Sequence, residues 1–324
     1  MRQRALRPLA LLLSLLLPLV AGAQELPVIR AAVLQIGTVN WELATITANG
    51  FDRKHGFTLE MQPYADNGAT RIAVEGGAAD MAVADWIWVA RQRAEGKDYV
   101  FIPYSRAVGG IVVPEDSQAK TLEDLRGGRI GIAGGPLDKS WLILRAYARQ
   151  AYGFDLKAET EQVYGAPPLV FKTALGAEYA GAINFWHFLS KAKAAGMREL
   201  ISVEEAGRAL GLDADTPLLG YYFKGGFLAD NPGLAQAFFD ASRDAKDLLT
   251  SSDAAWDAIR PSMNAANDAE FVQLRADWIA GIPDRVPVDR AAVDRMLALM
   301  SELGGPELVG KATSVPDGLF ADVQ

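Results

Sequence analysis

The sequence of 324 residues contains no cysteine, only two histidines, and no long apolar run beyond its first 23 residues. Without cysteine, thiol catalysis, disulfide scaffolds, cysteine-ligated zinc and a lipid anchor on an N-terminal cysteine are excluded. The two histidines, His55 and His187, are accompanied by no nucleophile-base pair and no metal-ligand spacing. We therefore expect a protein that is not an enzyme and that has no resident cofactor or metal.

Basic residues are in the minority. The chain has 32 Lys and Arg against 40 Asp and Glu, which gives a formal net charge of −8. An acidic surface repels polyanions, so the composition argues against nucleic acid and against anionic membranes as partners.

Residues 1–23 have the pattern of a cleaved export signal. Three arginines precede position 8, an apolar run covers residues 9–20, and Ala-Gly-Ala at 21–23 supplies a small-residue cleavage site. The apolar run is too short to span a membrane as a helix. We expect a soluble periplasmic protein, whose formal net charge falls from −8 to −11 when the three arginines are removed. The remaining chain is long enough for two lobes.

Short apolar runs alternate with helical patterns, which predicts an α/β fold with ligands held at the carboxyl ends of the strands. The predicted strands are 29–34, 58–63, 81–84, 99–104, 129–133, 162–164, 179–184 and 199–203. A helix is predicted at 42–54, and the chain is helical and amphipathic from 231 to about 300, with a loop-like tail after Gly304.

A weak internal repeat suggests that the two lobes are related. Gly76, Ala82, Val83 and Trp86 recur one hundred positions later as Gly176, Ala182, Ile183 and Trp186. Extended runs near 109 and 217 are predicted to cross between the lobes. Residues 24–109 and 217–324, with the C-terminal helices, then form lobe 1, and 110–216 form lobe 2.

The run Gly134-Gly135-Pro136-Leu137-Asp138-Lys139-Ser140-Trp141 follows a predicted strand and opens a predicted helix. The first N–H groups of a helix carry partial positive charge and favour an anion, and Lys139 adds a full charge. We predict that Gly135, Lys139, Ser140 and Trp141 bind a ligand. The alternative is that the glycines only make a turn and that Trp141 is a core residue.

Other polar and aromatic residues also follow predicted strands. These candidates are Thr38, Asn40, Trp41, Asp85, Trp86, Arg106, Asn184 and Trp186. Four of the seven tryptophans, two in each lobe, lie at such positions, although any one of them could belong to the core. Indole faces beside cationic groups suit a flat, conjugated anion. Asp85 could instead favour a ligand amine.

Three motifs carry a resemblance that covers nearly the whole exported chain. They are Gly37-Thr38-Val39-Asn40-Trp41, Gly76-Gly77-Ala78-Ala79-Asp80-Met81-Ala82, and Thr121-Leu122-Glu123-Asp124-Leu125-Arg126-Gly127-Gly128-Arg129-Ile130-Gly131. With them, the chain resembles periplasmic solute-binding proteins of the two-lobe, type II kind, in the nitrate, sulfonate, taurine and pyrimidine-precursor group. Arg126 and Arg129 stand where lysines are typical, and Tyr179 where an acidic residue is usual.

The resemblance implies a monomer whose two lobes close over a small-molecule ligand and present it to the permease of an ABC importer. Pyrroloquinoline quinone is the leading specific ligand that the aromatic and cationic residues suggest. A sulfonate, taurine or a pyrimidine precursor is the alternative. Two rival roles are an accessory protein of a quinoprotein dehydrogenase and an enzyme like the related pyrimidine synthases, which use a cysteine that this chain lacks.

Overall fold

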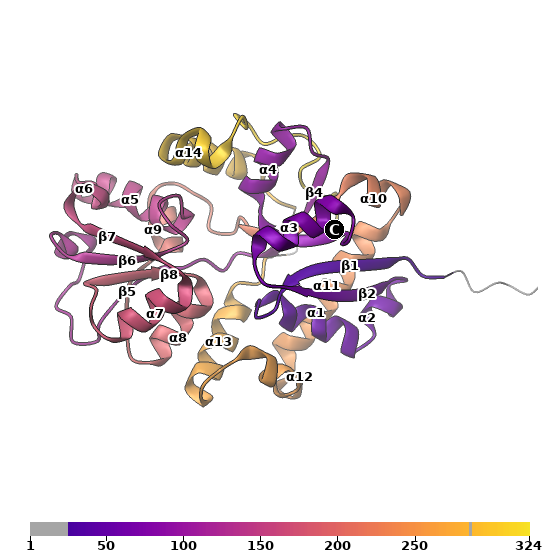
Figure 1. Cartoon of the computed structure of the whole chain (residues 1–324), viewed down its shortest axis with the longest axis horizontal. Coiled ribbons are helices and arrows are strands. Elements are labelled where there is room, and N and C mark those ends of the chain that lie inside the picture. Colours follow the sequence, from indigo (N-terminus) through magenta and orange to yellow (C-terminus); the bar gives the residue numbers. More distant parts are fainter. Residues whose placement is uncertain (1–24, 285–286) are drawn as a thin grey trace, which may run out of the picture.

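The computed structural model describes residues 25–284 and 287–324, so the predicted export signal lies outside the described residues. The chain forms two α/β lobes that lie side by side (Figure 1). The strand order is β2-β1-β3-β10-β4 in one sheet and β7-β6-β8-β5-β9 in the other. The predicted fold class is confirmed, because each lobe is a five-stranded sheet with helices on its faces.

Lobe 1 is built on β1, whose two faces are both buried. Ile29 and Val33 pack under α1 and α11, while Ala32 joins the core on the opposite face of the sheet. Strands β2 and β3 run parallel to β1, and β10 returns antiparallel between β3 and β4. The elements are β1 (Val28–Leu34), α1 (Val39–Ala48), α2 (Phe51–Lys54), β2 (Thr58–Tyr64), α3 (Asn67–Gly76), β3 (Met81–Asp85), α4 (Trp86–Ala94), β4 (Tyr99–Ser105), β10 (Leu219–Lys224) and α10 (Gly225–Asp230).

Lobe 2 repeats this arrangement, with β6 parallel to β7 and β8, and β5 antiparallel between β8 and β9. Its elements are β5 (Gly110–Val113), η1 (Leu122–Leu125), β6 (Arg129–Ala133), α5 (Lys139–Tyr152), α6 (Leu156–Glu159), β7 (Glu161–Gly165), α7 (Pro167–Leu175), β8 (Gly181–Asn184), α8 (Trp186–Ala194), β9 (Arg198–Ser202) and α9 (Val203–Ala209).

The internal repeat of the sequence falls on equivalent elements of the two lobes. Helices α1 and α5 begin at positions 39 and 139, strands β3 and β8 at 81 and 181, and helices α4 and α8 at 86 and 186. Strands β3 and β8 are both third in the strand order of their sheets, and β1 and β6, which precede α1 and α5, are both second. Four helix starts, α1 and α4 from lobe 1 and α5 and α8 from lobe 2, therefore follow the carboxyl ends of equivalent strands.

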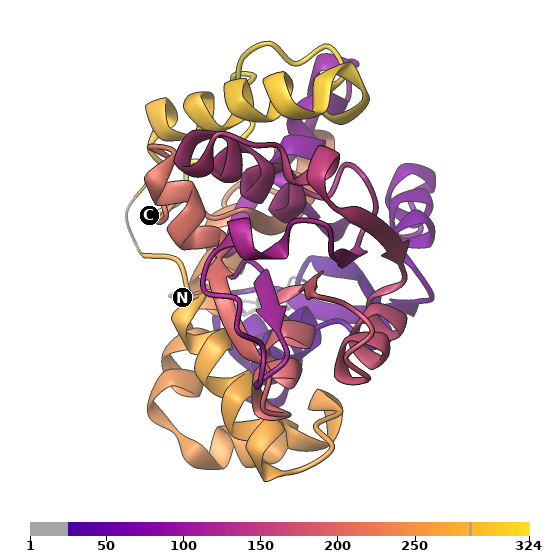
Figure 2. The same ribbon diagram turned by 90° about the vertical axis from the view of Figure 1, so that its left-hand side faces the viewer.

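The C-terminal helices contact both lobes, whereas the sequence assigned them to lobe 1. They are α11 (Leu234–Ser251), α12 (Asp253–Ile259), η2 (Arg260–Met263), α13 (Asp268–Ala280) and α14 (Arg290–Val309). Helix α11 packs on α1, but α13 packs on α8 of lobe 2, and α14 packs on α4 and α5. Figure 2 shows α14 and the α12–α13 region on opposite sides of the molecule.

Two predicted helix boundaries are wrong, in both cases at a glycine. Gly50 has a φ of +66° and separates α1 from α2, where one continuous helix was expected. Gly305 has a φ of +61° and interrupts α14, but the helix resumes and continues to Val309. The expected loop-like tail after Gly304 therefore begins only after Val309, since residues 310–324 contain no helix. No helix in the described ranges is long and apolar enough to cross a membrane.

Candidate ligand-binding site

An ion pair between Lys139 and Asp85 joins the two lobes at the starts of α5 and α4. The Lys139 Nζ donates to Asp85 Oδ2 at 2.9 Å, and both side chains are more than three-quarters buried. Asp85 also caps α4, because its Oδ1 accepts from the Trp88 N–H at 2.9 Å. Lys139 is predicted to bind a ligand anion, but in the structure it pairs with Asp85, a carboxylate of the chain itself.

A ligand anion is predicted to bind at the start of α5. In the structure the carboxylate of Asp138 occupies this helix start. Its Oδ1 accepts from the Trp141 N–H at 3.0 Å, as a cap residue does. Burial raises the pKa of Asp138 from 3.8 to about 6, and the charge of Asp85 adds to this shift, against the N–H donors and Lys139. Two acidic side chains and one cation therefore meet between α4 and α5.

The raised pKa of Asp138 predicts an unusual response to its replacement. The folded protein holds a proton that the unfolded chain has lost, so the stability that Asp138 contributes falls as pH rises from 3.8 through about 6. Asparagine caps helices as well as aspartate does. We expect Asp138→Asn to increase the free energy of unfolding by about 1–3 kcal/mol at pH 7 and by much less at pH 4, measured by urea denaturation.

A suitable control is Asp66→Asn, which replaces the exposed cap of α3. This variant should show no gain at either pH. If wild type and Asp138→Asn had the same free energy of unfolding at pH 7, the ionised Asp138 carboxylate would not destabilise the folded protein, and the prediction would be wrong.

Trp41 and Trp186 meet edge to face where α1 and α8 begin. Their ring centroids are 5.9 Å apart, and the residues are 3% and 7% exposed. Because Trp41 belongs to lobe 1 and Trp186 to lobe 2, the pair is a contact between lobes. Trp256 and Trp278 extend it, with Trp41 and Trp256 at 6.3 Å and Trp256 and Trp278 at 5.4 Å. In the sequence, Trp256 and Trp278 fall within the amphipathic helical region from 231 to about 300, and no local signal links them to the site.

Trp86 and Trp141 are core residues, which corrects their expected place at the wall of a ligand site. Both are 0% exposed and belong to the large apolar cluster that also contains residues of α14. The Trp86 ring packs 6.2 Å from Phe320 in the C-terminal tail. All four predicted tryptophans are therefore buried, Trp41 and Trp186 in the apolar cluster with Trp256 and Trp278, and the other two in the cluster that reaches α14.

Arg106 is bound by the chain itself at the crossing between β4 and β5. Its guanidinium contacts Asp215 at 2.5 Å, and its Nε donates to the Ala280 carbonyl at 3.3 Å. Arg106 is predicted to bind a ligand, but in the structure its guanidinium connects the crossing to the end of α13.

The remaining predicted residues lie at the same edge but are largely engaged by backbone. Asn184 is 5% exposed; its Nδ2 donates to the Pro167 carbonyl at 2.9 Å, and its Oδ1 accepts from the Phe185 N–H at 2.9 Å. Asn40 Nδ2 donates to the Leu34 carbonyl at 2.8 Å, but its buried Oδ1 has no hydrogen-bond partner. The other three, which are half-buried, are Thr38, Gly135 and Ser140.

Neither histidine suggests catalysis or metal binding. Burial, with a contribution from Lys191, lowers the pKa of His187 to about 4, so its imidazole is neutral at pH 7. His55 follows the last residue of α2, and its Nε2 lies 2.7 Å from the Asp244 carboxylate on α11. Among the residues that the structure describes, no three His, Asp or Glu side chains are grouped so that they could hold a metal ion.

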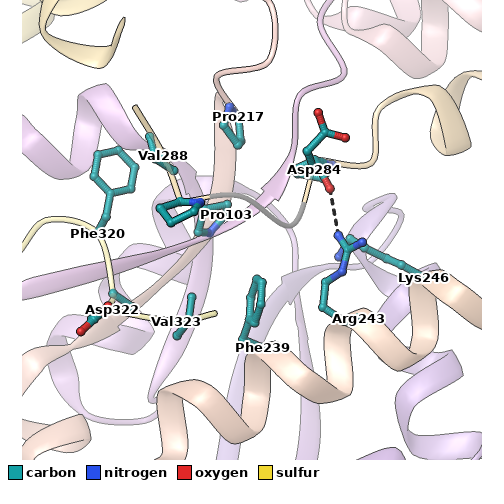
Figure 3. A pocket seen from close by; sticks show the side chains of 13 residues that line it. Pro103, Pro217, Phe239, Arg243, Lys246, Asp284, Val288, Phe320, Asp322 and Val323 are labelled. Carbon is teal, nitrogen blue, oxygen red and sulfur yellow. Dashed lines mark hydrogen bonds between the residues drawn. The ribbon is translucent and has the colours of Figure 1, made fainter. Parts of the chain in front are cut away.

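A cavity of about 240 Å³ lies in lobe 1, and none of the predicted site residues lines it (Figure 3). Arg243 and Lys246 project toward it from α11, and Arg243 donates to the Pro283 carbonyl at 2.9 Å. Phe239, Val288 and Phe320 are among its apolar walls. A second cavity, of about 40 Å³, is lined by Arg106 and has room for little more than water.

Comparison with known proteins places the chain in a family. The model of the family described as NMT1/THI5 like matches residues 43–253, more than half of the 324 residues. The chain belongs to the NMT1/THI5-like family. None of the curated proteins with which it was compared matches it.

Solved structures share the fold of this NMT1/THI5-like protein at low sequence identity. The periplasmic aliphatic sulphonate binding protein SsuA from Escherichia coli has a TM-score of 0.70 and 18% identity, covering 92% of this chain and 94% of that one. The alkanesulfonate-binding protein SsuA from Xanthomonas axonopodis pv. citri, bound to MOPS, has a TM-score of 0.63 and 15% identity, with 92% and 97% covered. A Candida albicans protein described as having the generic periplasmic binding protein fold has a TM-score of 0.60 and 13% identity, with 91% and 96% covered.

Proposed function

We propose that this chain is the periplasmic solute-binding component of an ABC importer, and that it captures a small zwitterion such as an aminosulfonate between its lobes. The family, the two-lobe fold and the export pattern of residues 1–23 support the transport role. The ligand class rests on a single observation, the Lys139–Asp85 ion pair between the lobes.

A zwitterion is the kind of ligand that can replace this ion pair without leaving a charge unpaired. Its acidic group would pair with Lys139 and its ammonium group would pair with Asp85, so that each partly buried ion keeps a counter-charge. A simple anion would pair with Lys139 and leave Asp85 without its partner, close to Asp138. Taurine has the required charges and is also consistent with the sulfonate ligands named for the two SsuA proteins.

The proposal is tested with taurine and ethanesulfonate, which differ only in the amine. By isothermal titration calorimetry, taurine should bind more tightly, by roughly tenfold or more, because only its ammonium pairs with Asp85. Equal binding of the two sulfonates would overturn the assigned role of Asp85. The absence of binding by either would overturn the ligand class but not the transport role.

Pyrroloquinoline quinone is the second candidate ligand, and the edge-to-face Trp41–Trp186 pair favours it because separation of the lobes would free an indole face from each for a flat ring system. It ranks lower because Lys139 and Arg106 already contact carboxylates of the chain. Absorbance and mass spectrometry of the protein purified from its host would detect it. Co-purification of a dehydrogenase in place of a small molecule would support the accessory role.

Replacing Lys139 with glutamine should weaken taurine binding by about 1.5–3 kcal/mol, the range for hydrogen bonds to charged groups. The substitution also leaves the largely buried Asp85 carboxylate without its counter-charge, so the thermal midpoint should fall as well. Calorimetric titration and a melting curve measure the two effects separately. Lys172→Gln, an exposed lysine on α7, is the matched control. A lower melting point with unchanged affinity would make Lys139 a purely structural residue.

A further inference from the structure

Helix α13 is attached to both lobes through two adjacent residues, Asp277 and Trp278. On the lobe 2 side, Asp277 accepts from the Ser190 hydroxyl at 2.6 Å and pairs with Lys193 at 2.9 Å. Both partners lie on α8, the helix that Trp186 begins. The ion pair between Lys191 and Glu270, at 3.2 Å, strengthens the same contact about two turns earlier on α13.

On the lobe 1 side, Trp278 reaches the loop before α1 through a tyrosine. The Trp278 Nε1 donates to the Tyr104 hydroxyl at 3.0 Å, and that hydroxyl donates to the Thr38 carbonyl at 3.4 Å. The end of α13 is also fixed to the crossing between the lobes, because the Gly281 carbonyl accepts from the Arg106 N–H at 2.9 Å. One helix therefore holds the loop before α1 and the second half of α8.

We propose that Asp277 and Trp278 are positioning residues, which set the separation of the two halves of the proposed binding site without touching the ligand. The inference rests on the proposed function. Adjacent residues of one helix cannot move independently, so a shift of α8 is transmitted to Tyr104 and the Thr38 loop. The aromatic contacts from Trp278 through Trp256 to Trp41 follow the same route.

The contact can be weakened without exposing the core. In Asp277→Ala, the Ser190 hydroxyl still donates to the Trp186 carbonyl at 2.9 Å, and Lys193 still has Glu199 at 3.7 Å. The α8 side chains thus keep polar partners within lobe 2, while the link to α13 is lost. We therefore expect a folded protein whose lobes are less firmly placed relative to each other.

The absence of cysteine allows the separation of the lobes to be measured directly. Nitroxide labels are attached in an Ile72→Cys, Leu175→Cys background, at exposed sites on α3 of lobe 1 and α7 of lobe 2. Double electron-electron resonance should give a single narrow distance distribution in this background. Asp277→Ala should broaden the distribution or shift it to longer distances, and Trp278→Phe should do so to a smaller extent. Asp277→Glu should restore the narrow distribution.

Glu161→Gln is the matched control, since it removes an exposed ion pair with Arg129 within lobe 2. It should leave the distance distribution unchanged. An Asp277→Ala distribution identical to that of the control would overturn the positioning role, whatever the melting temperature. If Asp277→Ala does not fold, Lys193→Gln removes the same ion pair from its lobe 2 side. Its distance distribution is then compared with that of Glu161→Gln, and identical distributions would overturn the positioning role.

Affinity gives a second readout that separates this inference from the proposed function. If wild type binds taurine, Asp277→Ala should raise the Kd by roughly fivefold or more, the lower range of coupling between distant sites, and Asp277→Glu should recover most of it. An unchanged Kd in Asp277→Ala would overturn the coupling. If wild type does not bind taurine, the ligand class fails, while the label distances still test α13.

Discussion

Replacing Lys246 with alanine is expected to lower the free energy of unfolding by about 3–5 kcal/mol, the cost of breaking a buried ion pair. Lys246 on α11 is 2% exposed and pairs with Glu42 on α1, which is 0% exposed. Glu42 also accepts from the Tyr221 hydroxyl at 2.9 Å and from the Ser242 hydroxyl at 2.6 Å. Those two neutral donors would remain, but they cannot neutralise the carboxylate.

Chemical denaturation at pH 7 measures this loss, and Lys54→Ala is the control. Lys54 pairs with Asp244 at 2.6 Å but is 59% exposed, so its removal should cost at most about 1 kcal/mol. Replacing both buried partners, as in Glu42→Gln with Lys246→Met, should cost less than Lys246→Ala alone, because no buried charge is then left unpaired. A loss in Lys246→Ala no larger than in Lys54→Ala would show that water reaches Glu42.

Much of the fold could be predicted from the sequence because its signals are local. Strand β1 is apolar except for Arg30, since helices cover both of its faces, and this composition distinguishes it from a surface strand. The repeat at one hundred positions was visible in only four residue pairs, yet α4 and α8 begin at its last pair, Trp86 and Trp186. The capping box of η1, which Thr121 and Asp124 form, is a local sequence pattern of the same kind.

The partners of the charged residues could not be predicted, because they come from distant parts of the chain. Lys139 lies 54 positions from Asp85, and Arg106 lies 109 positions from Asp215. A sequence shows that a cation follows a strand but not that a carboxylate of the other lobe faces it. The same limit applies to α13, whose amphipathic pattern does not tell which lobe its polar face meets.

The tryptophans show why position at a strand end is not sufficient evidence of a binding role. Trp41 and Trp141 occupy equivalent places near the starts of α1 and α5, as Trp86 and Trp186 do in α4 and α8. Only Trp41 and Trp186 form the contact between α1 and α8, whereas Trp86 and Trp141 lie in the cluster beneath α14. The C-terminal helices therefore determine which buried cluster each tryptophan joins, α12 and α13 covering Trp41 and Trp186, and α14 covering the other two.

Replacing Trp141 with alanine tests this division. Trp141 is 0% exposed, so truncation should leave a cavity and lower the free energy of unfolding by about 3–5 kcal/mol. The affinity for taurine, measured by calorimetry well below the melting temperature, should change little. Trp186→Ala is the comparison, because its ring lies on Trp41 across the lobes and its loss should weaken binding as well as stability. Weaker binding with unchanged stability in Trp141→Ala would instead show that Trp141 contacts the ligand. Because Trp141 is fully buried, the start of α5 would then have to open when the ligand binds.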